Sequence, residues 1–240
     1  MGLASEAPHV LVDLPLAIDP AEILRFQGYK PGAVPDAVVR ALFDEALVLG
    51  RALVRPRAAL RWLPARLAAD RLEAGGVAFT VPGLSAAWGA IEYLAAAVAT
   101  IGGALEQRVR ELWDARELPL AAMLDSVGSA AVESLAEYLN DLLCQQGLPH
   151  GLRVTNRVSP GYGDWDVADQ RALFAICPGD GVGVTLNEAC FMLPEKTITL
   201  VAGAGVAARV DHYFAQCARC WMRDCAYRRV PARASVRRDG

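Results

Sequence analysis

The chain has 240 residues, of which 54% are hydrophobic, and a formal net charge of −3 at pH 7. A chain of this length and composition can bury a substantial core, and its slightly acidic balance argues against a nucleic-acid-binding surface. The N-terminus has neither the basic start nor the apolar run of a signal peptide, and the longest apolar stretch, 93–105, is too short to span a bilayer. We therefore expect a globular cytoplasmic protein without nucleic-acid or membrane partners.

Residues 1–35 alternate short apolar runs with five prolines, which predicts a strand, turns and a short helix. Asp19 and Pro20 suit the N-cap and the first position of a helical turn. Apolar residues at a helical period indicate a second helix that begins at Asp36 and ends at Gly50. Residues 52–76 are rich in Arg and Ala and contain two prolines, which predicts a linker followed by a strand.

The following part of the chain is predicted to mix strands and helices. Strands are expected at 77–80, 93–101, 152–158, 182–186 and 197–202, and helices at 85–90, 104–114, 118–146 and 166–176. The alanines of 93–101 favour a helix by intrinsic propensity, so the strand there is taken from the family resemblance given below. Elements in this order predict an α+β fold with a largely antiparallel sheet.

The segment Arg157-Val-Ser-Pro-Gly-Tyr162 combines a cation, a tight turn and an aromatic ring within six positions. The Pro-Gly pair favours a turn in which a ligand can approach the main chain. Arg157 can form a two-pronged hydrogen bond to a carboxylate, and the ring of Tyr162 can attract a ligand cation such as a sulfonium. An ordinary surface turn is the alternative, because Pro-Gly is common turn punctuation.

Several further motifs accompany this turn. They are Gly163-Asp-Trp165, Asp169-Gln170, Gly181-Val-Gly-Val-Thr-Leu-Asn-Glu188, Met192-x-Pro194 and Lys196-Thr-Ile-Thr199, with Tyr93–Gly102 and Leu124–Leu139 upstream. Together they resemble the activation domain of cobalamin-dependent methionine synthase, and in particular its stand-alone relatives. The resemblance covers roughly residues 77–203. It implies a twisted, largely antiparallel sheet flanked by helices, in a single domain over 1–205 whose first 75 residues are divergent.

The resemblance also implies a ligand, S-adenosylmethionine, and residues that hold it. Arg157 would pair with the methionine carboxylate, Glu133 would face the ammonium group, and Ser159, Gly161 and Tyr162 would contact the ligand through the turn. The family uses one more acidic residue near its N-terminus, to which no residue of this chain is assigned. Glu137, one turn after Glu133, is interpreted as solvated helix surface.

The C-terminal tail, 206–240, carries three closely spaced cysteines, Cys217, Cys220 and Cys225. In a cytosolic protein such spacing indicates metal or redox chemistry before structural disulfides. Three thiolates are one ligand short of a closed zinc site, so His212, Cys190 or a partner would complete it, or one position stays open. An iron–sulfur cluster with one other ligand and free thiols without metal are the alternatives.

Two functional hypotheses follow from the resemblance. In the first, the chain is an activation subunit that supports reductive remethylation of the corrinoid of a methionine synthase or a related methyltransferase, and so takes part in methyltransferase activity. The D-x-H-x-x-G sequence that grips cobalamin is absent. The corrinoid would therefore come on a partner protein, and electrons from a flavodoxin-like or iron–sulfur protein. In the second, the chain is a non-catalytic S-adenosylmethionine sensor or scaffold that binds a corrinoid protein. A weaker idea is electron entry through the cysteine tail.

Overall fold

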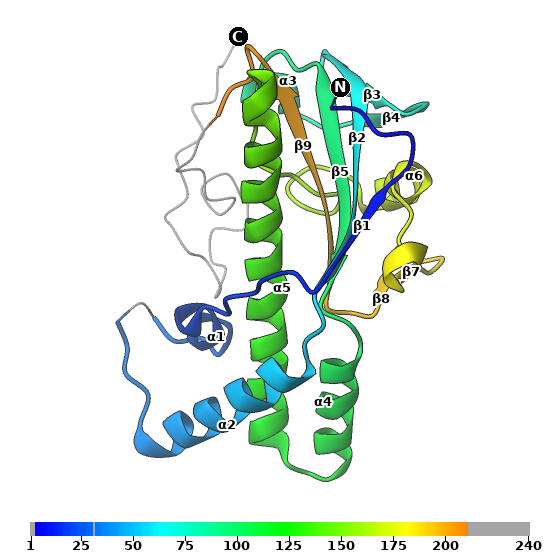
Figure 1. Cartoon of the computed structure of the whole chain (residues 1–240). Helices are drawn as coiled ribbons and strands as arrows, with labels where there is room; N and C mark the ends of the chain where they lie inside the picture. Colours follow the sequence, from blue (N-terminus) through cyan, green and yellow to red (C-terminus); the bar gives the residue numbers. More distant parts are fainter. Residues whose placement is uncertain (1–2, 31, 211–240) are drawn as a thin grey trace.

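A computed structural model of the chain describes residues 3–30 and 32–210, and its centre is one antiparallel sheet (Figure 1). The strands lie in the order β4-β3-β2-β5-β9-β6, and β1 pairs with β2 beside this path. Their bounds are β1 His9–Val12, β2 Arg57–Ala68, β3 Arg71–Ala74, β4 Val77–Thr80, β5 Tyr93–Thr100, β6 Arg153–Val154 and β9 Thr197–Gly205. The predicted α+β class with an antiparallel sheet is confirmed.

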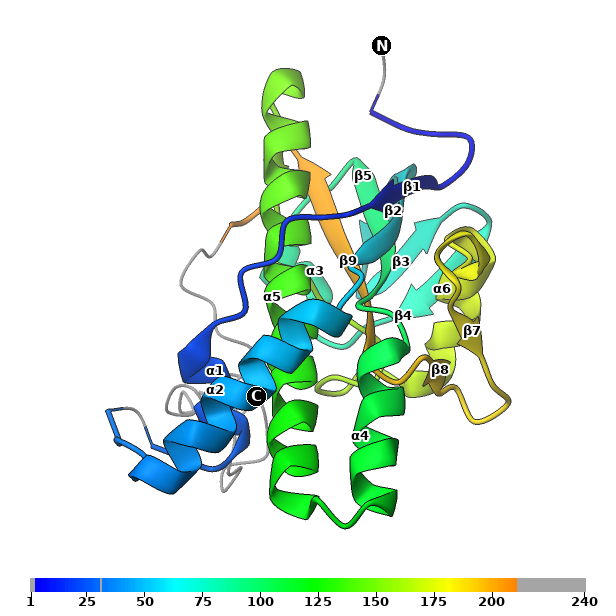
Figure 2. The same cartoon turned by 60° about the horizontal axis from the view of Figure 1, so that its bottom comes forward.

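Helices cover the sheet and extend beyond one of its ends. Their bounds are α1 Pro20–Phe26, α2 Ala37–Leu53, α3 Leu84–Trp88, α4 Ala104–Asp114, α5 Leu118–Gly147 and α6 Gln170–Ile176. The long α5 lies along one face of the sheet, with α2 and α4 packed at its N-terminal half (Figures 1 and 2). None of the helices in 3–30 and 32–210 is long and apolar enough to cross a membrane.

The sheet separates two hydrophobic cores. Ala95, Ala97 and Ala99 of β5 face the core that α5 closes, whereas Leu94, Ala96 and Val98 face the core that includes Trp165 and α6. Seven of the eight residues of β5 and all nine residues of β9 are buried. The predicted strand at 93–101 is therefore confirmed, because burial on both faces of the sheet overrides the helical propensity of alanine.

Strand β2 is longer than the sequence indicated, and it continues through Pro64. The N–H of Ala65 donates to the Glu92 carbonyl at 2.9 Å, on the β5 side. Successive backbone N–H groups of a strand point to opposite sides, so the Pro64 nitrogen faces away from β5. On that side, β1 pairs with β2 only up to Leu60, and β3 pairs with β2 only from Ala65 onward. No strand therefore pairs with Pro64 there. The linker predicted for the first part of 52–76 is therefore largely strand, and Pro64 does not interrupt it because this position needs no N–H donor.

Helix α2 was predicted to end at Gly50, and this prediction is wrong. The helix continues to Leu53, with Gly50 buried inside it. A Cβ atom on Gly50 would lie 2.4 Å from Cγ1 of Val127 on α5. The glycine therefore allows α2 and α5 to cross closely. In the sequence alone, a glycine after an apolar helical pattern predicts the end of a helix, and this is why the prediction stopped there.

Two predicted strands are much shorter in the structure. Of 152–158 only Arg153–Val154 forms β6, and Val158 adds an isolated bridge to Val201 of β9. Between them Thr155 departs from the ladder, because its Oγ1, in place of its carbonyl, accepts from the N–H of Gly203 at 2.9 Å. Of 182–186 only β7, Thr185–Leu186, is a strand, and it pairs with β8, Met192–Leu193.

The α2–α5 crossing can be tested by filling it. We expect Gly50→Leu to lower the free energy of unfolding by about 1–3 kcal/mol, because the added side chain overpacks a well-filled contact. The matched control is Ala52→Leu, at an exposed position of the same helix, which should change it by less than about 0.5 kcal/mol. Urea unfolding followed by circular dichroism measures both variants. Equal stability of the two would contradict the close crossing.

Candidate functional site

The Ser-Pro-Gly-Tyr segment forms a turn that is anchored to both the sheet and the second core. Gly161 has φ of 88°, a left-handed conformation that favours glycine, and its N–H donates to the Trp165 carbonyl at 2.9 Å. The buried Trp165 packs edge to face on Phe79, with ring centroids 5.6 Å apart, and its Nε1 donates to Asp169 at 2.7 Å. The turn is thus held by a tryptophan rather than left free in solvent.

Ser159 ties the turn to the central sheet. Its side chain is buried, and Oγ donates to the carbonyl oxygen of Thr199 on β9 at 2.5 Å. The hydroxyl therefore stabilises the position of the turn against β9. Tyr162, at the end of the turn, has its ring about half exposed.

Arg157 and Glu133 are in direct contact, although 24 positions separate them in the sequence. The guanidinium of Arg157 donates to Oε2 of Glu133 on α5 at 3.0 Å, and Oε1 of Glu137 lies 3.6 Å from the same nitrogen. The side chains of Arg157 and Glu133 are 13% and 22% exposed, while that of Glu137 is 63% exposed. Glu137 is solvated, as predicted, and it also lies within ion-pair distance of the arginine.

These carboxylates belong to a longer polar ridge on α5. Asp125, Ser129, Glu133 and Glu137 recur every four residues and so share one face of the helix. Nζ of Lys196, just before β9, lies 2.8 Å from Asp125 and donates to Ser129 at 3.0 Å. Two cations from segments that flank the sheet edge, Lys196 and Arg157, therefore meet this ridge.

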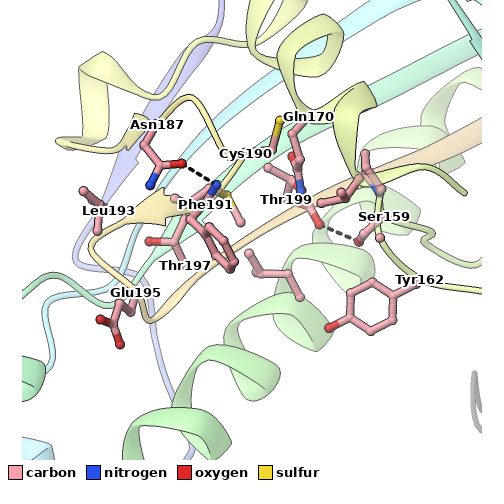
Figure 3. Close-up of a pocket in the computed structure, with 15 residues that line it drawn as sticks. Ser159, Tyr162, Gln170, Asn187, Cys190, Phe191, Leu193, Glu195, Thr197 and Thr199 are labelled. Atoms are coloured by element: carbon pink, nitrogen blue, oxygen red, sulfur yellow. Dashed lines mark hydrogen bonds between the residues drawn. The ribbon is translucent and has the colours of Figure 1, made fainter.

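A pocket of about 650 Å³ opens at the edge of β9, and Ser159, Gly161 and Tyr162 line it (Figure 3). The other lining residues are Pro160, Val167, Gln170, Asn187, Cys190, Phe191, Met192, Leu193, Glu195, Thr197, Ile198 and Thr199. Glu133 and Arg157 are not among them. The predicted site residues therefore gather at two places. One is the ion pair between Arg157 and Glu133 of α5, and the other is the pocket behind the turn. The short segment from Arg157 to Ser159 joins them.

The loop between β7 and β8 forms one wall of this pocket. Asn187 holds the loop, because its Oδ1 accepts from the N–H groups of Ala189 and Phe191 at 3.0 and 2.9 Å. This arrangement presents Phe191 and Leu193 as exposed apolar side chains at the pocket. The sequence motifs included this segment, but no ligand-binding role was assigned to it or to Gln170, because only the folded sheet edge shows that they face one cavity.

The predicted metal ligands Cys217, Cys220 and Cys225, together with His212, lie outside the described residues. Within 3–30 and 32–210, no group of three or more His, Cys, Asp or Glu side chains could hold a metal ion. Cys190, considered as a fourth ligand, is buried and lines the pocket. A metal at the C-terminal cysteines stays a prediction.

Comparison with known proteins gives one informative result, at the level of the fold. No protein-family model matches the chain, and neither does any curated protein. Among solved structures, a match is the crystal structure of the MetH reactivation domain bound to AdoHcy, with a TM-score of 0.59 and 15% sequence identity. The match covers 89% of this chain and 82% of the other.

The fold therefore places the chain in a structural class. It has the fold of a methionine synthase reactivation domain, as the turn and strand motifs predicted. At 15% identity the likeness concerns the arrangement of the backbone and not the roles of individual side chains in ligand binding.

Cys177 provides a test of the second core. Its thiol is buried and donates to the Ala59 carbonyl at 3.5 Å, and burial raises its pKa to about 12. The thiolate is the reactive form, so we expect no alkylation of Cys177 by iodoacetamide at pH 8 in the native protein and complete alkylation in guanidinium chloride. Peptide mapping by mass spectrometry measures both. Labelling of native Cys177 within minutes would contradict this packing.

Proposed function

We propose that this chain binds S-adenosylmethionine and acts as the activation subunit of a cobalamin-dependent methionine synthase or a related corrinoid methyltransferase. The observation that carries the proposal is the contact between Arg157 and Glu133, at 3.0 Å, beside the Ser-Pro-Gly-Tyr turn. The solved domain with the same fold is described with AdoHcy bound, which supports a ligand of this class.

A contact of this kind suits the amino-acid end of the ligand. The carboxylate and ammonium groups of methionine are attached to one carbon, so the protein charges that complement them must lie side by side. Arg157 and Glu133 supply a cation and a carboxylate in that arrangement. A guanidinium has five N–H donors in a planar fork, and it can therefore bridge a protein carboxylate and a ligand carboxylate. When the zwitterion binds, the ion pair between Arg157 and Glu133 would be replaced by two ion pairs, one from Arg157 to the ligand carboxylate and one from Glu133 to the ligand ammonium.

The turn would then hold the sulfonium end. The exposed ring of Tyr162 offers a π face to a cation, and left-handed Gly161 carries no side chain that would keep a ligand from the backbone. Ser159 positions both by fastening the turn to β9. In this arrangement the methyl group would face the side from which a partner protein approaches.

The proposed reaction needs no general base from this chain. A one-electron donor, flavodoxin-like or iron–sulfur, would reduce the partner's inactive Co(II) corrinoid to Co(I). The Co(I) electron pair would attack the methyl carbon of the sulfonium, so that a Co–C bond forms, the S–C bond breaks and S-adenosylhomocysteine leaves. The contribution of the chain would be to orient the ligand and exclude water.

The binding step is tested by isothermal titration calorimetry with S-adenosylmethionine at low ionic strength. We expect Arg157→Ala to weaken binding at least about tenfold, or 1.4 kcal/mol, because a charge-assisted contact to the carboxylate is lost. Arg153→Ala is the matched control, since Arg153 is an exposed cation of the neighbouring β6. Equal affinities of the two variants would reject Arg157 as the carboxylate ligand.

The catalytic step is tested with methyl-labelled S-adenosylmethionine, a Co(II) corrinoid methyltransferase and a reductant. We expect label to reach the corrinoid only when this chain is present, and Glu133→Gln to reduce the transfer by about tenfold at subsaturating ligand. A change in affinity for the corrinoid protein on adding S-adenosylmethionine, without transfer of label, would instead identify a non-catalytic sensor or scaffold.

A further inference from the structure

Strand β1 lies at the edge of the sheet opposite to the edge formed by β9 and β6 (Figure 1). It pairs with β2 on one side, and no other strand of the described residues pairs with it. Its sequence, His9-Val-Leu-Val12, contains no Lys, Arg, Asp, Glu or Pro. Edge strands of monomeric proteins are usually protected by such residues, so an edge without them is a candidate for pairing with a further strand.

The hydrogen-bonding groups on this edge follow from the alternation of the strands. The N–H of Ala65 donates toward β5, so the odd-numbered residues of β2 direct their backbone groups to β5. The even-numbered ones face β1, where Ala58 pairs with Leu11. Leu11 therefore faces β2, and its neighbours Val10 and Val12 direct their N–H and C=O groups outward. Within 3–30 and 32–210, these four groups have no hydrogen-bond partner.

The side chains of the two valines are exposed as well. Val10 is 49% and Val12 57% exposed, on the face of the sheet opposite to that of Leu11, which packs against the first core. Contacts between β-branched side chains on neighbouring strands stabilise a sheet. The edge thus offers both hydrogen-bonding groups and apolar surface to another strand.

Strand β1 is held in position at both of its ends. Before it, the guanidinium of Arg61 on β2 donates to the carbonyls of Ser5 and Glu6, at 3.4 and 2.6 Å. After it, Leu14 is buried in the first core. Pairing with an edge that is already fixed costs little conformational entropy.

We propose that β1 pairs antiparallel with β1 of a second copy of this chain, about a two-fold axis at Leu11, so that the two sheets join into one. In this register Val10 lies opposite Val12 of the second copy, and Val12 lies opposite Val10. Both pairs are hydrogen-bonded, so each strand uses all four of its outward groups. The four valines meet on one face of the joined sheet.

The same register brings opposite charges together. It places His9 opposite Asp13 of the second copy, and the symmetry repeats this contact. Both residues are exposed, and neither belongs to an ion pair among the described residues. A cross-strand contact between an imidazole and a carboxylate therefore flanks the valines on each side.

The two nearest registers use the edge less well. A shift of two residues in one direction places Val12 opposite Pro8, which has no N–H to donate. A shift in the other direction places Val10 opposite Leu14, which is buried in its own chain. A shift of one residue would oppose groups that face β2. The two-fold axis at Leu11 is therefore the register that satisfies the edge.

This pairing leaves the candidate sites accessible in both copies. The pocket lies at the edge of β9, and Arg157 follows β6, so both are separated from β1 by β2 and β5. The inference therefore does not rest on the proposed function.

Sedimentation equilibrium of the full chain, with a reductant to exclude intermolecular disulfides, tests the association. One short strand from each copy is a small interface, so we expect a monomer–dimer equilibrium with a Kd of about 10–100 µM. In ¹H–¹⁵N spectra of the labelled chain, the amide signals of Val10 and Val12 should shift with concentration. The amide of Leu11, already bonded to β2, should be protected from hydrogen exchange at every concentration.

Val12→Pro removes an outward N–H without touching the pairing of β1 with β2, and proline is tolerated on such an edge. We expect it to keep the wild-type circular dichroism and to weaken the dimer at least about tenfold, because a hydrogen bond is lost on each side of the axis. The matched control, Val12→Thr, keeps the N–H and the branched side chain and should stay within about threefold. A folded Val12→Pro that associates like the wild type would overturn the proposal.

A second pair of variants tests the register, and it serves even if Val12→Pro does not fold. His9→Glu places a carboxylate opposite Asp13 and should weaken the dimer about fivefold. Adding Asp13→Asn should restore most of the affinity, and asparagine suits the left-handed φ of 50° at that position. An unchanged dimer in His9→Glu would overturn this register.

A chain that stays monomeric at about 200 µM, twice the upper limit of the expected Kd, would overturn self-pairing. So would β1 amide signals that shift only when a corrinoid methyltransferase is added, because the edge would then belong to another protein. Calorimetric affinity for S-adenosylmethionine should stay within about twofold in Val12→Pro, since the sites are far apart. Absence of S-adenosylmethionine binding in the wild type would contradict the proposed function and leave the dimer test unaffected.

Discussion

Burial of β5 and β9 on both faces is the constraint on which the rest of this structure depends. A strand packed on both sides needs side chains small enough for its neighbours, and here alanines and glycines let α5 approach on one face and the Trp165 layer on the other. A Cβ on Gly203 would lie 2.7 Å from Ile91 and 2.9 Å from Trp88, which shows how closely the second layer is packed. A glycine likewise permits close packing where α2 crosses α5 at Gly50.

The edge of this buried sheet is where the candidate sites arise. Thr155 leaves the ladder after two residues of β6, and the chain returns to β9 only at Val158 before it turns at Ser159. On the side away from β5, residues 197–200 of β9 therefore pair with no strand among the described residues, and their backbone groups on that side meet side chains and a cavity instead. An uncovered sheet edge usually needs protection, and a pocket closed by a turn and a hairpin loop provides it.

Helix α5 connects the core to the charged groups. Its buried residues close the first core, while the ridge from Asp125 to Glu137 meets Lys196 and Arg157 at the sheet edge. A rigid helix thereby sets the spacing between carboxylates, and the two cations fasten the flanking segments of the sheet to it. Arg157 both fastens its segment to α5 and is the proposed ligand of the methionine carboxylate. Substitutions at Arg157 therefore need a folding control as well as a binding assay.

Much of the fold was predictable from the sequence, because local patterns determine local elements. The capped turn at Asp19 and Pro20, helices 104–114 and 118–146, and the antiparallel class all follow from caps, periodicity or motif resemblance, and the structure has them. The sequence also marked the Arg157–Tyr162 turn. Only the tertiary structure decided that Gly50 is a helix-crossing contact, that Pro64 lies inside a strand and that Arg157 meets Glu133. It also brought Gln170 and Thr197 to one cavity. These depend on which distant segments become neighbours, and local propensity carries no information about that.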